Sequence, residues 1–376
     1  MWTVVNMVDR FCDRYDFTIV TRNYDSKGDT TPFTSVQTNE WNQCGNAQVF
    51  YASKEKLTNS NAAKLVRQIK PDLIYLNSAL SKPVLNLLFA RKKGEVNGIP
   101  VVLAPCGELA KGALSVKPLK KRLFLKYAKF FNLYRGVIWK ASSDLEAIEI
   151  IDVIGKDCFT ITAPDLAPKT ILPDFADEHK PIKVKGSVKF IFLSRMVPKK
   201  NLNYFLERLN GIDEGAITLN IVGPLEDKKY WKDCLDSISH LSKNITVNIH
   251  GPVSYPKGLE MLFDNHFFVL PTLNENFGYV FLEALAAGCP LLISDRTVWN
   301  NIEEVNAGWA IPLENPDIWL DKLKYCIDMG EEEYLMLSKT ARSYATNWLA
   351  DPTLGNDTEK VLHYAFNSAA QMNVDQ

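Results

Sequence analysis

Residues 267–293 set the strongest constraint on how this chain folds. An apolar run at 267–270 predicts a buried strand, and an acidic loop and a helix-like segment ending at Gly288 follow it. A second apolar run, 290–293, predicts another buried strand. Consecutive apolar residues without polar alternation are typical of strands in a parallel sheet that helices cover on both faces. The stretch therefore predicts an α/β fold.

Two glutamates, Glu275 and Glu283, flank the predicted start of this helix. At about 3.6 residues per turn, Glu283 falls about two turns into the helix. We expect Asn276, Phe277 and Gly278 to open the helix, where N–H groups lack intrahelical partners and the dipole is positive. Such a helix start suits a diphosphate, and the carboxylates on either side suit sugar hydroxyls. The segment predicts a nucleotide-sugar site; the alternative is one solvated loop glutamate and one helix-surface glutamate.

The spacing of Glu275 and Glu283, with the continuation 288–294, resembles the retaining glycosyltransferases of family 4, also called glycosyl transferases group 1. The resemblance implies the GT-B fold: two Rossmann-like doubly wound α/β domains face across a cleft, and a C-terminal helix crosses back. It implies a hexosyltransferase that moves a sugar with retention from a nucleoside diphosphate to a hydroxyl acceptor, in polysaccharide or glycolipid biosynthesis. In the family the first glutamate contacts the donor sugar and the second contacts the nucleotide ribose.

A second motif supports the same resemblance. The apolar run 190–194 predicts a buried strand, Arg195 follows it directly, and Lys200 comes five positions later. In the family both cations contact the donor diphosphate, where a guanidinium and an ammonium stabilise the charge of the leaving group. The catalytic candidates are thus Glu275, Arg195 and Lys200, whereas Lys199 reads as a solvated lysine. Because no Asp-x-Asp triplet occurs, we expect no metal, and no cofactor besides the donor substrate.

The length of 376 residues suits two domains. Each half predicts a parallel sheet, with strands at 17–21, 47–51, 73–76, 101–104 and 137–139, and then at 190–194, 218–222, 246–249, 267–270 and 290–293. A segment rich in Pro, Asp and Lys at 164–185 predicts the linker. We expect an acceptor-side domain at 1–175, a nucleotide-sugar domain at 176–345, and C-terminal helices at 346–376 that cross back.

Glycine–proline pairs end two of the predicted strands in the second half, at 223–224 and 251–252. Doubly wound sheets bind ligands at the carboxyl ends of their strands. In the family the second of these loops lies near the nucleotide base. The resemblance therefore implies backbone contacts to the base from Gly251, Pro252 and Val253.

The N-terminus differs from the family pattern. Residues 2–11 have a helical period, whereas the family begins with a central strand and a Gly-rich loop. We expect this strand and loop to be missing, through a misassigned start or a shortened chain. A non-catalytic or shortened GT-B protein that binds sugar nucleotides or partners is therefore an alternative function. A sugar-nucleotide epimerase, which shares the GT-B architecture, is another.

Acceptor-side candidates are few. The first half contains no histidine, although many relatives place one near the donor sugar. Glu108 and Asn77 follow predicted buried strands and are the acceptor-side candidates. For Glu108 a helix-capping or solvated carboxylate is an equal alternative.

Residues 111–140 contain nine basic residues and no acidic one, with apolar and aromatic residues between them. This composition suits an anionic membrane surface, which would bring a lipid-linked acceptor to the enzyme; a sugar acceptor is the other possibility. The equal alternative is a basic helix face that covers the sheet with its lysines in water. No nucleic-acid module accompanies the segment, so we expect no nucleic-acid partner.

Composition supports an ordinary globular protein. The hydrophobic content is 46% and the formal net charge is −1. The seven cysteines are scattered without a C-x-x-C pair, so the sequence predicts neither a disulfide framework nor a zinc site. We expect a cytoplasmic protein, peripheral to the inner face of a membrane if the basic segment binds there.

Overall fold

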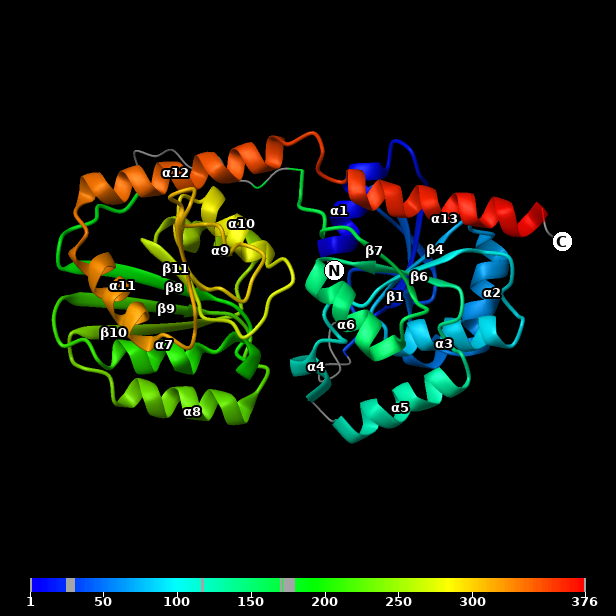
Figure 1. The fold of residues 1–376 in the computed structure, drawn as a ribbon, viewed down its shortest axis with the longest axis horizontal. Helices are drawn as coiled ribbons and strands as arrows, with labels where there is room; N and C mark the ends of the chain where they lie inside the picture. Colours follow the sequence, from blue (N-terminus) through cyan, green and yellow to red (C-terminus); the bar gives the residue numbers. More distant parts are fainter. Residues whose placement is uncertain (1, 25–30, 116–117, 170, 172–179, 375–376) are drawn as a thin grey trace. The chain divides into compact units, whose positions relative to one another are not determined.

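The computed structural model describes residues 2–24, 31–115, 118–169, 171 and 180–374. The chain divides into two compact units (Figure 1). The N-terminal unit contains Met1–Lys169 together with Thr353–Gln376, and the C-terminal unit contains Thr170–Pro352.

The C-terminal unit is built on one parallel sheet of six strands in the order β10-β9-β8-β11-β12-β13. All five strands predicted for this half are present, and β13 is an addition. The central strands are buried because helices cover both faces of the sheet. The strands are β8 (Ser187–Leu193), β9 (Ala216–Val222), β10 (Ile245–Gly251), β11 (Phe267–Leu270), β12 (Leu291–Ser294) and β13 (Gly308–Ile311).

Helices lie on both faces of this sheet, as Figure 1 shows. One face carries α7 (Leu202–Leu209), α8 (Lys228–Ser239) and α11 (Pro316–Asp328), and the other carries α9 (Tyr255–Phe263), α10 (Tyr279–Ala286) and α12 (Glu331–Ala350). The short 3-10 helix η3 (Pro198–Lys200) connects β8 to α7. Asp227 starts α8 by accepting a hydrogen bond from the Tyr230 N–H through its side chain.

The N-terminal unit contains two separate sheets, so the prediction of a single parallel sheet was wrong for this half. The larger is parallel, in the order β4-β5-β6-β7; the smaller has the order β1-β3-β2. In the smaller sheet β2 pairs antiparallel with β3 across the two-residue turn Gly45–Asn46, where Gly45 has φ 55°. The strands are β1 (Phe17–Arg22), β2 (Trp41–Cys44), β3 (Ala47–Ala52), β4 (Ile74–Asn77), β5 (Val101–Ala104), β6 (Val137–Ala141) and β7 (Phe159–Thr162).

The helices of the N-terminal unit pack on the apolar faces of its sheets. Residues of α3, α5 and α6 pack in the main cluster on β4, β5 and β6, whereas Val361 and Ala365 of α13 cover the opposite face at Val102 and Ile138. The helical period at the start of the chain is confirmed as α1. The helices are α1 (Trp2–Phe11), η1 (Lys54–Lys56), α2 (Asn59–Ile69), α3 (Lys82–Lys92), α4 (Lys111–Ser115), α5 (Pro118–Phe130), α6 (Asp144–Ile154) and α13 (Asn356–Val374).

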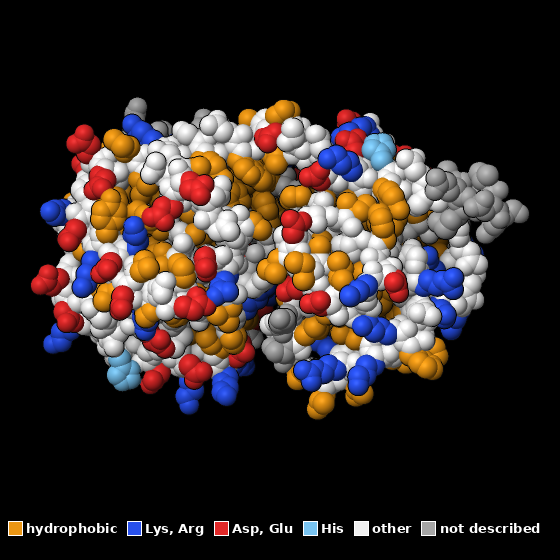
Figure 2. All heavy atoms as spheres, viewed as in Figure 1, with side chains coloured by type: hydrophobic (Ala, Val, Ile, Leu, Met, Phe, Trp, Pro, Cys, Tyr) orange, Lys and Arg blue, Asp and Glu red, His pale blue; other side chains and the backbone are white. Residues whose placement is uncertain are grey.

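Hydrophobic and basic side chains lie together over α5 on the surface of the N-terminal unit. Figure 2 shows hydrophobic and basic side chains side by side along the lower margin, where Figure 1 places α5. In the described residues no helix is long and apolar enough to cross a membrane.

The predicted linker at 164–185 lies partly outside the described residues, which omit 170 and 172–179. Two lysines at its end are buried rather than solvated. Lys180 Nζ donates to the carbonyls of Phe263, Asn265 and Ala287 at the ends of α9 and α10. Lys183 Nζ donates to carbonyls at the end of α11, and burial lowers its pKa to about 8. Cations at helix C-termini are favoured by the helix dipole.

Candidate functional site

The acidic loop between β11 and α10 lies at the carboxyl edge of the C-terminal sheet. The helix begins at Tyr279, with Gly278 as its N-cap residue. The prediction that Asn276, Phe277 and Gly278 open the helix was therefore wrong, and Glu283 lies little more than one turn into it. The three residues instead form the end of the loop that leads into the positive end of the helix dipole.

Backbone geometry at Gly278 explains the later start of the helix. Gly278 has φ 70°, a left-handed conformation that glycine adopts without steric cost. A Cβ atom there would lie 2.5 Å from the Phe281 ring and 2.9 Å from Cγ of Glu275. The turn therefore brings the backbone close to the side chain of Glu275, and only glycine fits.

Lys200 and Glu275 form an ion pair, although they are 75 positions apart in the sequence. Their side chains are only 10% and 17% exposed, so water screens the pair weakly. Lys200 ends η3, and the Glu275 backbone N–H donates to the Arg296 carbonyl at 3.0 Å. The structure thus brings together the ammonium and the carboxylate that the two sequence motifs singled out.

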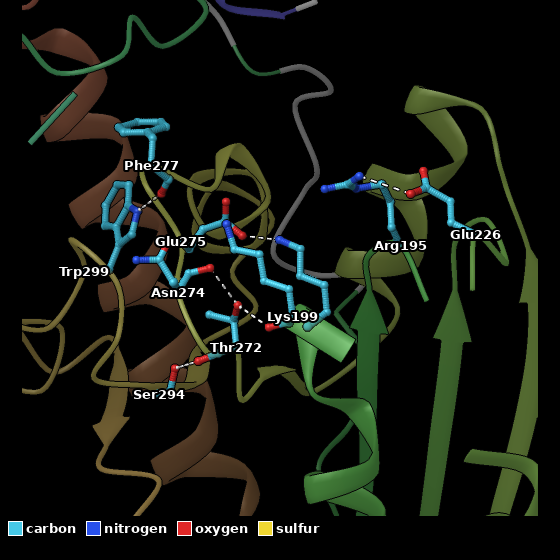
Figure 3. A network of polar contacts seen from close by, with 10 residues as sticks. Arg195, Lys199, Glu226, Thr272, Asn274, Glu275, Phe277, Ser294 and Trp299 are labelled. Carbon is cyan, nitrogen blue, oxygen red and sulfur yellow. Dashed lines mark hydrogen bonds and ion pairs between the residues drawn. The ribbon is translucent and has the colours of Figure 1, made fainter. Parts of the chain in front are cut away.

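A network of hydrogen bonds holds the two segments in place (Figure 3). The Lys199 carbonyl accepts from the Leu273 N–H at 2.9 Å and lies 3.1 Å from the Thr272 hydroxyl oxygen. The Ser294 hydroxyl, at the end of β12, donates to the Thr272 carbonyl at 2.6 Å. Carboxyl ends of neighbouring strands therefore fix the loop that carries Glu275.

Trp299 was not predicted and anchors the other end of the loop. Its indole N–H donates to the Phe277 carbonyl at 2.7 Å, and the side chain is buried (Figure 3). The rings of Phe277, Trp299 and Trp348 pack against one another with centroids 5.6–5.7 Å apart. No signal in the sequence pairs Trp299 with the loop, because the contact depends on the packing of α12.

Arg195 lies beyond the end of β8, and Figure 3 shows it past the arrowheads of the strands with Glu226. Its guanidinium pairs with Glu226 at 3.1 Å, and both side chains are exposed. The backbone segments that follow β8 and β9 approach closely: a Cβ atom on Gly223 would lie 2.0 Å from the Ser194 carbonyl oxygen. Glu226 was not predicted as a partner of the arginine.

Glu283 is a half-buried residue on α10. Burial raises the pKa of Glu283 to about 7, so the group titrates near neutral pH. Burial also raises the pKa of Tyr255 to about 12, and the charge of Glu283 adds to that shift. Tyr255 begins α9 directly after the loop that holds Gly251, Pro252 and Val253. The structure thus places Glu283 near the start of α9, and Tyr255 is a further candidate that the sequence analysis missed.

The acceptor-side candidates lie in the N-terminal unit. Glu108 accepts hydrogen bonds from the Ser78 hydroxyl and from the N–H groups of Ala79 and Leu80, at 2.8–2.9 Å. These contacts support the capping alternative, since Glu108 holds the loop before α3. Asn77 ends β4 and is half-buried. Ser78 has φ 81°, a strained conformation for a serine.

Among the residues that the structure describes, no group of three His, Cys, Asp or Glu side chains is arranged to hold a metal ion. The site instead consists of two cations, three carboxylates and a helix N-terminus. Such a set is chemically suited to a molecule that carries both negative charge and hydroxyl groups.

The two parallel sheets and the edge site define a GT-B protein. Residues 174–344 match the family described as glycosyl transferases group 1, which confirms the resemblance. The match lies within the C-terminal unit, which holds the Glu275 loop and the end of β8. No curated protein matches the chain.

Solved structures confirm the fold over nearly the whole chain. HepE from Anabaena, in complex with UDP and glucose, is 16% identical, with a TM-score of 0.66 over 96% of this chain and 95% of that one. Sucrose-phosphate synthase from Thermosynechococcus elongatus is 14% identical, with a TM-score of 0.68 over 98% and 92%. WaaG, a glycosyltransferase of lipopolysaccharide biosynthesis, is 12% identical, with a TM-score of 0.64 over 96% and 94%.

Proposed function

We propose that this protein is a retaining glycosyltransferase that moves a hexosyl group from a nucleoside diphosphate to a hydroxyl acceptor. The observation that carries the proposal is the weakly screened pair of Lys200 and Glu275 in front of α10. An ammonium for the diphosphate and a carboxylate for the sugar stand side by side there. The matched family and the UDP bound by HepE support the same donor class.

In this proposal the cations exchange partners when the donor binds. Arg195 leaves Glu226, Lys200 leaves Glu275, and both bind the diphosphate, with the N-terminal dipole of α10 behind it. The loop residues Asn276, Phe277 and Gly278 supply backbone contacts to the diphosphate. Glu275 is then free to accept hydrogen bonds from the donor sugar.

Glu283 and the loop before α9 bind the nucleoside end of the donor. Ionised Glu283 accepts hydrogen bonds from the ribose hydroxyls, and these bonds favour its charged form. Gly251, Pro252 and Val253 contact the base through backbone groups. Gly251 has φ 66°, and no atom lies within 4 Å of the position of a Cβ there, so the backbone is open to a ligand.

The chemical step is a displacement in which charge moves onto the diphosphate. The bond from the anomeric carbon to the phosphate oxygen breaks, and that oxygen takes the electron pair beside Arg195 and Lys200. The acceptor oxygen attacks from the same side, and its proton passes to the diphosphate. Positioning and charge stabilisation supply most of the rate, and no metal is required.

The acceptor is a sugar or a lipid-linked hydroxyl compound, with Asn77 as the candidate contact and Glu108 as its neighbour. In this proposal the enzyme takes part in polysaccharide or glycolipid biosynthesis on the cytoplasmic side of a membrane. HepE, which shares the fold, binds UDP and glucose in its crystal structure, and WaaG, which also shares it, is a glycosyltransferase involved in lipopolysaccharide biosynthesis.

A GT-B protein that binds sugar nucleotides without transferring the sugar is a second candidate. The observation that favours it is the engagement of Glu108 as a cap by Ala79 and Leu80. A carboxylate used in this way is not free to accept a hydrogen bond from an acceptor hydroxyl group.

Calorimetric titration with UDP and with GDP tests the donor site. We expect the parent to bind one of them, and Arg195→Ala and Glu283→Ala to weaken it roughly ten- to a hundredfold, as for lost hydrogen bonds to charged groups. Lys189→Ala is the matched control, because Lys189 is an exposed lysine on β8 before its carboxyl end. Absence of binding by a folded parent would refute the proposal.

A further inference from the structure

The helix α5 has an exposed face that is both apolar and basic. Leu119, Leu123, Tyr127 and Phe130 recur at spacings of three and four residues, so they lie on one side of the helix. They are 77%, 67%, 44% and 80% exposed, and Phe131, 43% exposed, extends the row past the helix end. We refer to these five residues as the α5 stripe.

The α5 stripe is not the face that packs on the protein. The opposite side of the helix contributes Ala128, which is buried, and Phe124, which is half-buried, to the core of the N-terminal unit. The basic helix therefore covers the sheet with other residues and turns its largest apolar side chains to solvent. The alternative from the sequence, a basic helix face that covers the sheet with its lysines in water, agrees with the packing of α5 but does not account for the exposed apolar side chains.

Basic side chains border the α5 stripe. Lys120, Arg122, Lys126 and Lys129 are exposed, and in the part of the chain that the structure describes none of them pairs with a carboxylate. Lys121 is different, because its Nζ donates to the Ala113 carbonyl at 2.6 Å. No acidic residue occurs from 111 to 140, so α5 itself carries charge of one sign only.

Three aromatic rings stabilise the C-terminal end of the stripe. The ring centroids of Tyr127 and Phe131 are 4.5 Å apart, and those of Phe130 and Phe131 are 5.0 Å apart. The rings therefore form a preordered cluster, with Tyr127 also near Phe89 of α3. Aromatic rings beside basic side chains suit the boundary between lipid headgroups and acyl chains.

We propose that the α5 stripe and its bordering cations dock on an anionic phospholipid bilayer, with α5 lying in the plane of the membrane surface. A bilayer offers both partners that this surface lacks: apolar contact for five exposed side chains, and negative headgroups for four cations. The docking goes beyond the proposed transfer reaction and does not depend on it. Delivery of a lipid-linked acceptor rests in addition on the proposed function.

Sedimentation of the full chain with vesicles tests the docking, without nucleotide or sugar present. The vesicles contain phosphatidylcholine alone, or phosphatidylcholine mixed with phosphatidylglycerol. We expect binding to the mixed vesicles only, weakening as salt is added, since salt screens the headgroup charge. Equal binding to both kinds of vesicle, or to neither, would overturn the proposal.

Paired variants assign the binding to α5. Leu123→Ser with Phe130→Ser should abolish sedimentation. Lys126→Glu with Lys129→Glu should weaken binding roughly twenty-five-fold or more, because each basic residue near an anionic surface contributes about fivefold. These side chains are exposed, so the variants should unfold at the parent's temperature.

Two control pairs match these changes within the same unit. Lys64→Glu with Arg67→Glu reverses two exposed charges on α2, and Leu145→Ser with Ile148→Ser removes two exposed apolar residues from α6. Both should sediment like the parent. Loss of binding in the controls, retention in the α5 variants, or an α5-dependent dimer in place of lipid binding would overturn the proposal. Nucleotide binding, measured separately, tests the proposed function and not the docking.

Discussion

Lys200 and Glu275 meet as an ion pair in which both side chains are more than four-fifths buried. The lysine comes from the end of η3 and the glutamate from the loop before α10, so the pair joins two strand ends of the C-terminal sheet. The ammonium is complementary to a negatively charged diphosphate, and the carboxylate can accept hydrogen bonds from the hydroxyl groups of a sugar. The pair therefore stabilises this edge of the sheet, and in the proposed function its two members bind the donor.

We expect single substitutions in this pair to destabilise the protein. Lys200→Met leaves the Glu275 carboxylate without its partner, and Glu275→Gln leaves the Lys200 ammonium without its partner. Each substitution should lower the free energy of unfolding by about 1–3 kcal/mol. The double variant should recover part of the loss, because no unpaired charge remains. Urea unfolding of the four proteins gives the coupling energy, and strictly additive losses would contradict the assigned pair.

Nucleotide affinity should depend on pH through Glu283. Its pKa is raised to about 7 by burial, so the carboxylate that accepts ribose hydroxyls forms as pH rises through that value. Affinity for the nucleoside diphosphate should rise over the same range and then level off. Titration of the nucleotide itself is common to all variants, so Glu283→Gln is the control and should lack this component. An identical pH profile in both proteins would refute the role of Glu283.

The same group makes stability depend on pH in the opposite direction. Because the folded pKa of Glu283 lies above its ordinary value of 4.5, the folded state holds the proton more tightly. Its contribution is fully present below the unfolded pKa and is lost as pH rises through about 7. Relative to Glu283→Gln, the parent should lose on the order of 3 kcal/mol of unfolding free energy between about pH 4.5 and about pH 8. Urea unfolding at both pH values measures the difference, and a constant difference would contradict the burial of a neutral carboxyl group.

Trp299 should position the loop between β11 and α10, which carries Glu275. Trp299→Phe keeps a ring in the cluster but removes the N–H that binds the Phe277 carbonyl, so nucleotide affinity should fall roughly tenfold. Trp319→Phe is the matched control, because the Trp319 indole N–H donates to the Pro312 carbonyl at 3.2 Å and lies on α11. Both variants should lose similar stability in thermal unfolding. If calorimetry shows equal nucleotide affinity in the two variants, Trp299 is only structural.

Gly278 should tolerate no side chain. Gly278→Ala adds both the strain of a left-handed residue, about 1–2 kcal/mol, and the contact with the Phe281 ring. Gly98→Ala isolates the first effect, because Gly98 has φ 72° and no atom lies within 4 Å of the position of its Cβ. We expect Gly278→Ala to lower the unfolding free energy by clearly more than Gly98→Ala in urea titrations. Equal losses would show that the loop moves to accept the methyl group.

The sequence was most informative where function depends on short spacings. The Glu275–Glu283 and Arg195–Lys200 spacings predicted a site at one edge of the sheet, and the apolar runs predicted every strand of the C-terminal sheet but β13. These signals are local, because consecutive apolar residues and glycines report on a single strand or turn. The fold class follows from them.

Other features depend on contacts between distant segments, and the sequence could not predict them. The anchoring of the loop by Trp299 depends on the packing of Trp348 on α12. The sequence did not decide whether Glu108 binds an acceptor or caps a helix, because only the tertiary structure shows the N–H groups of Ala79 and Leu80 beside it. The hairpin at Gly45–Asn46 did have a local signal, a two-residue turn, that the strand pattern alone overlooked.

The most direct test of the central claim is donor turnover with its stereochemistry. UDP- and GDP-hexoses with α-configured anomeric carbons would be incubated with the protein, and the released sugar or glycoside followed by proton NMR. We expect release of the nucleoside diphosphate and an α-configured first product, and we expect loss of both in Lys200→Ala while Lys189→Ala stays active. A β-configured first product, or equal turnover in Lys200→Ala, would contradict this expectation.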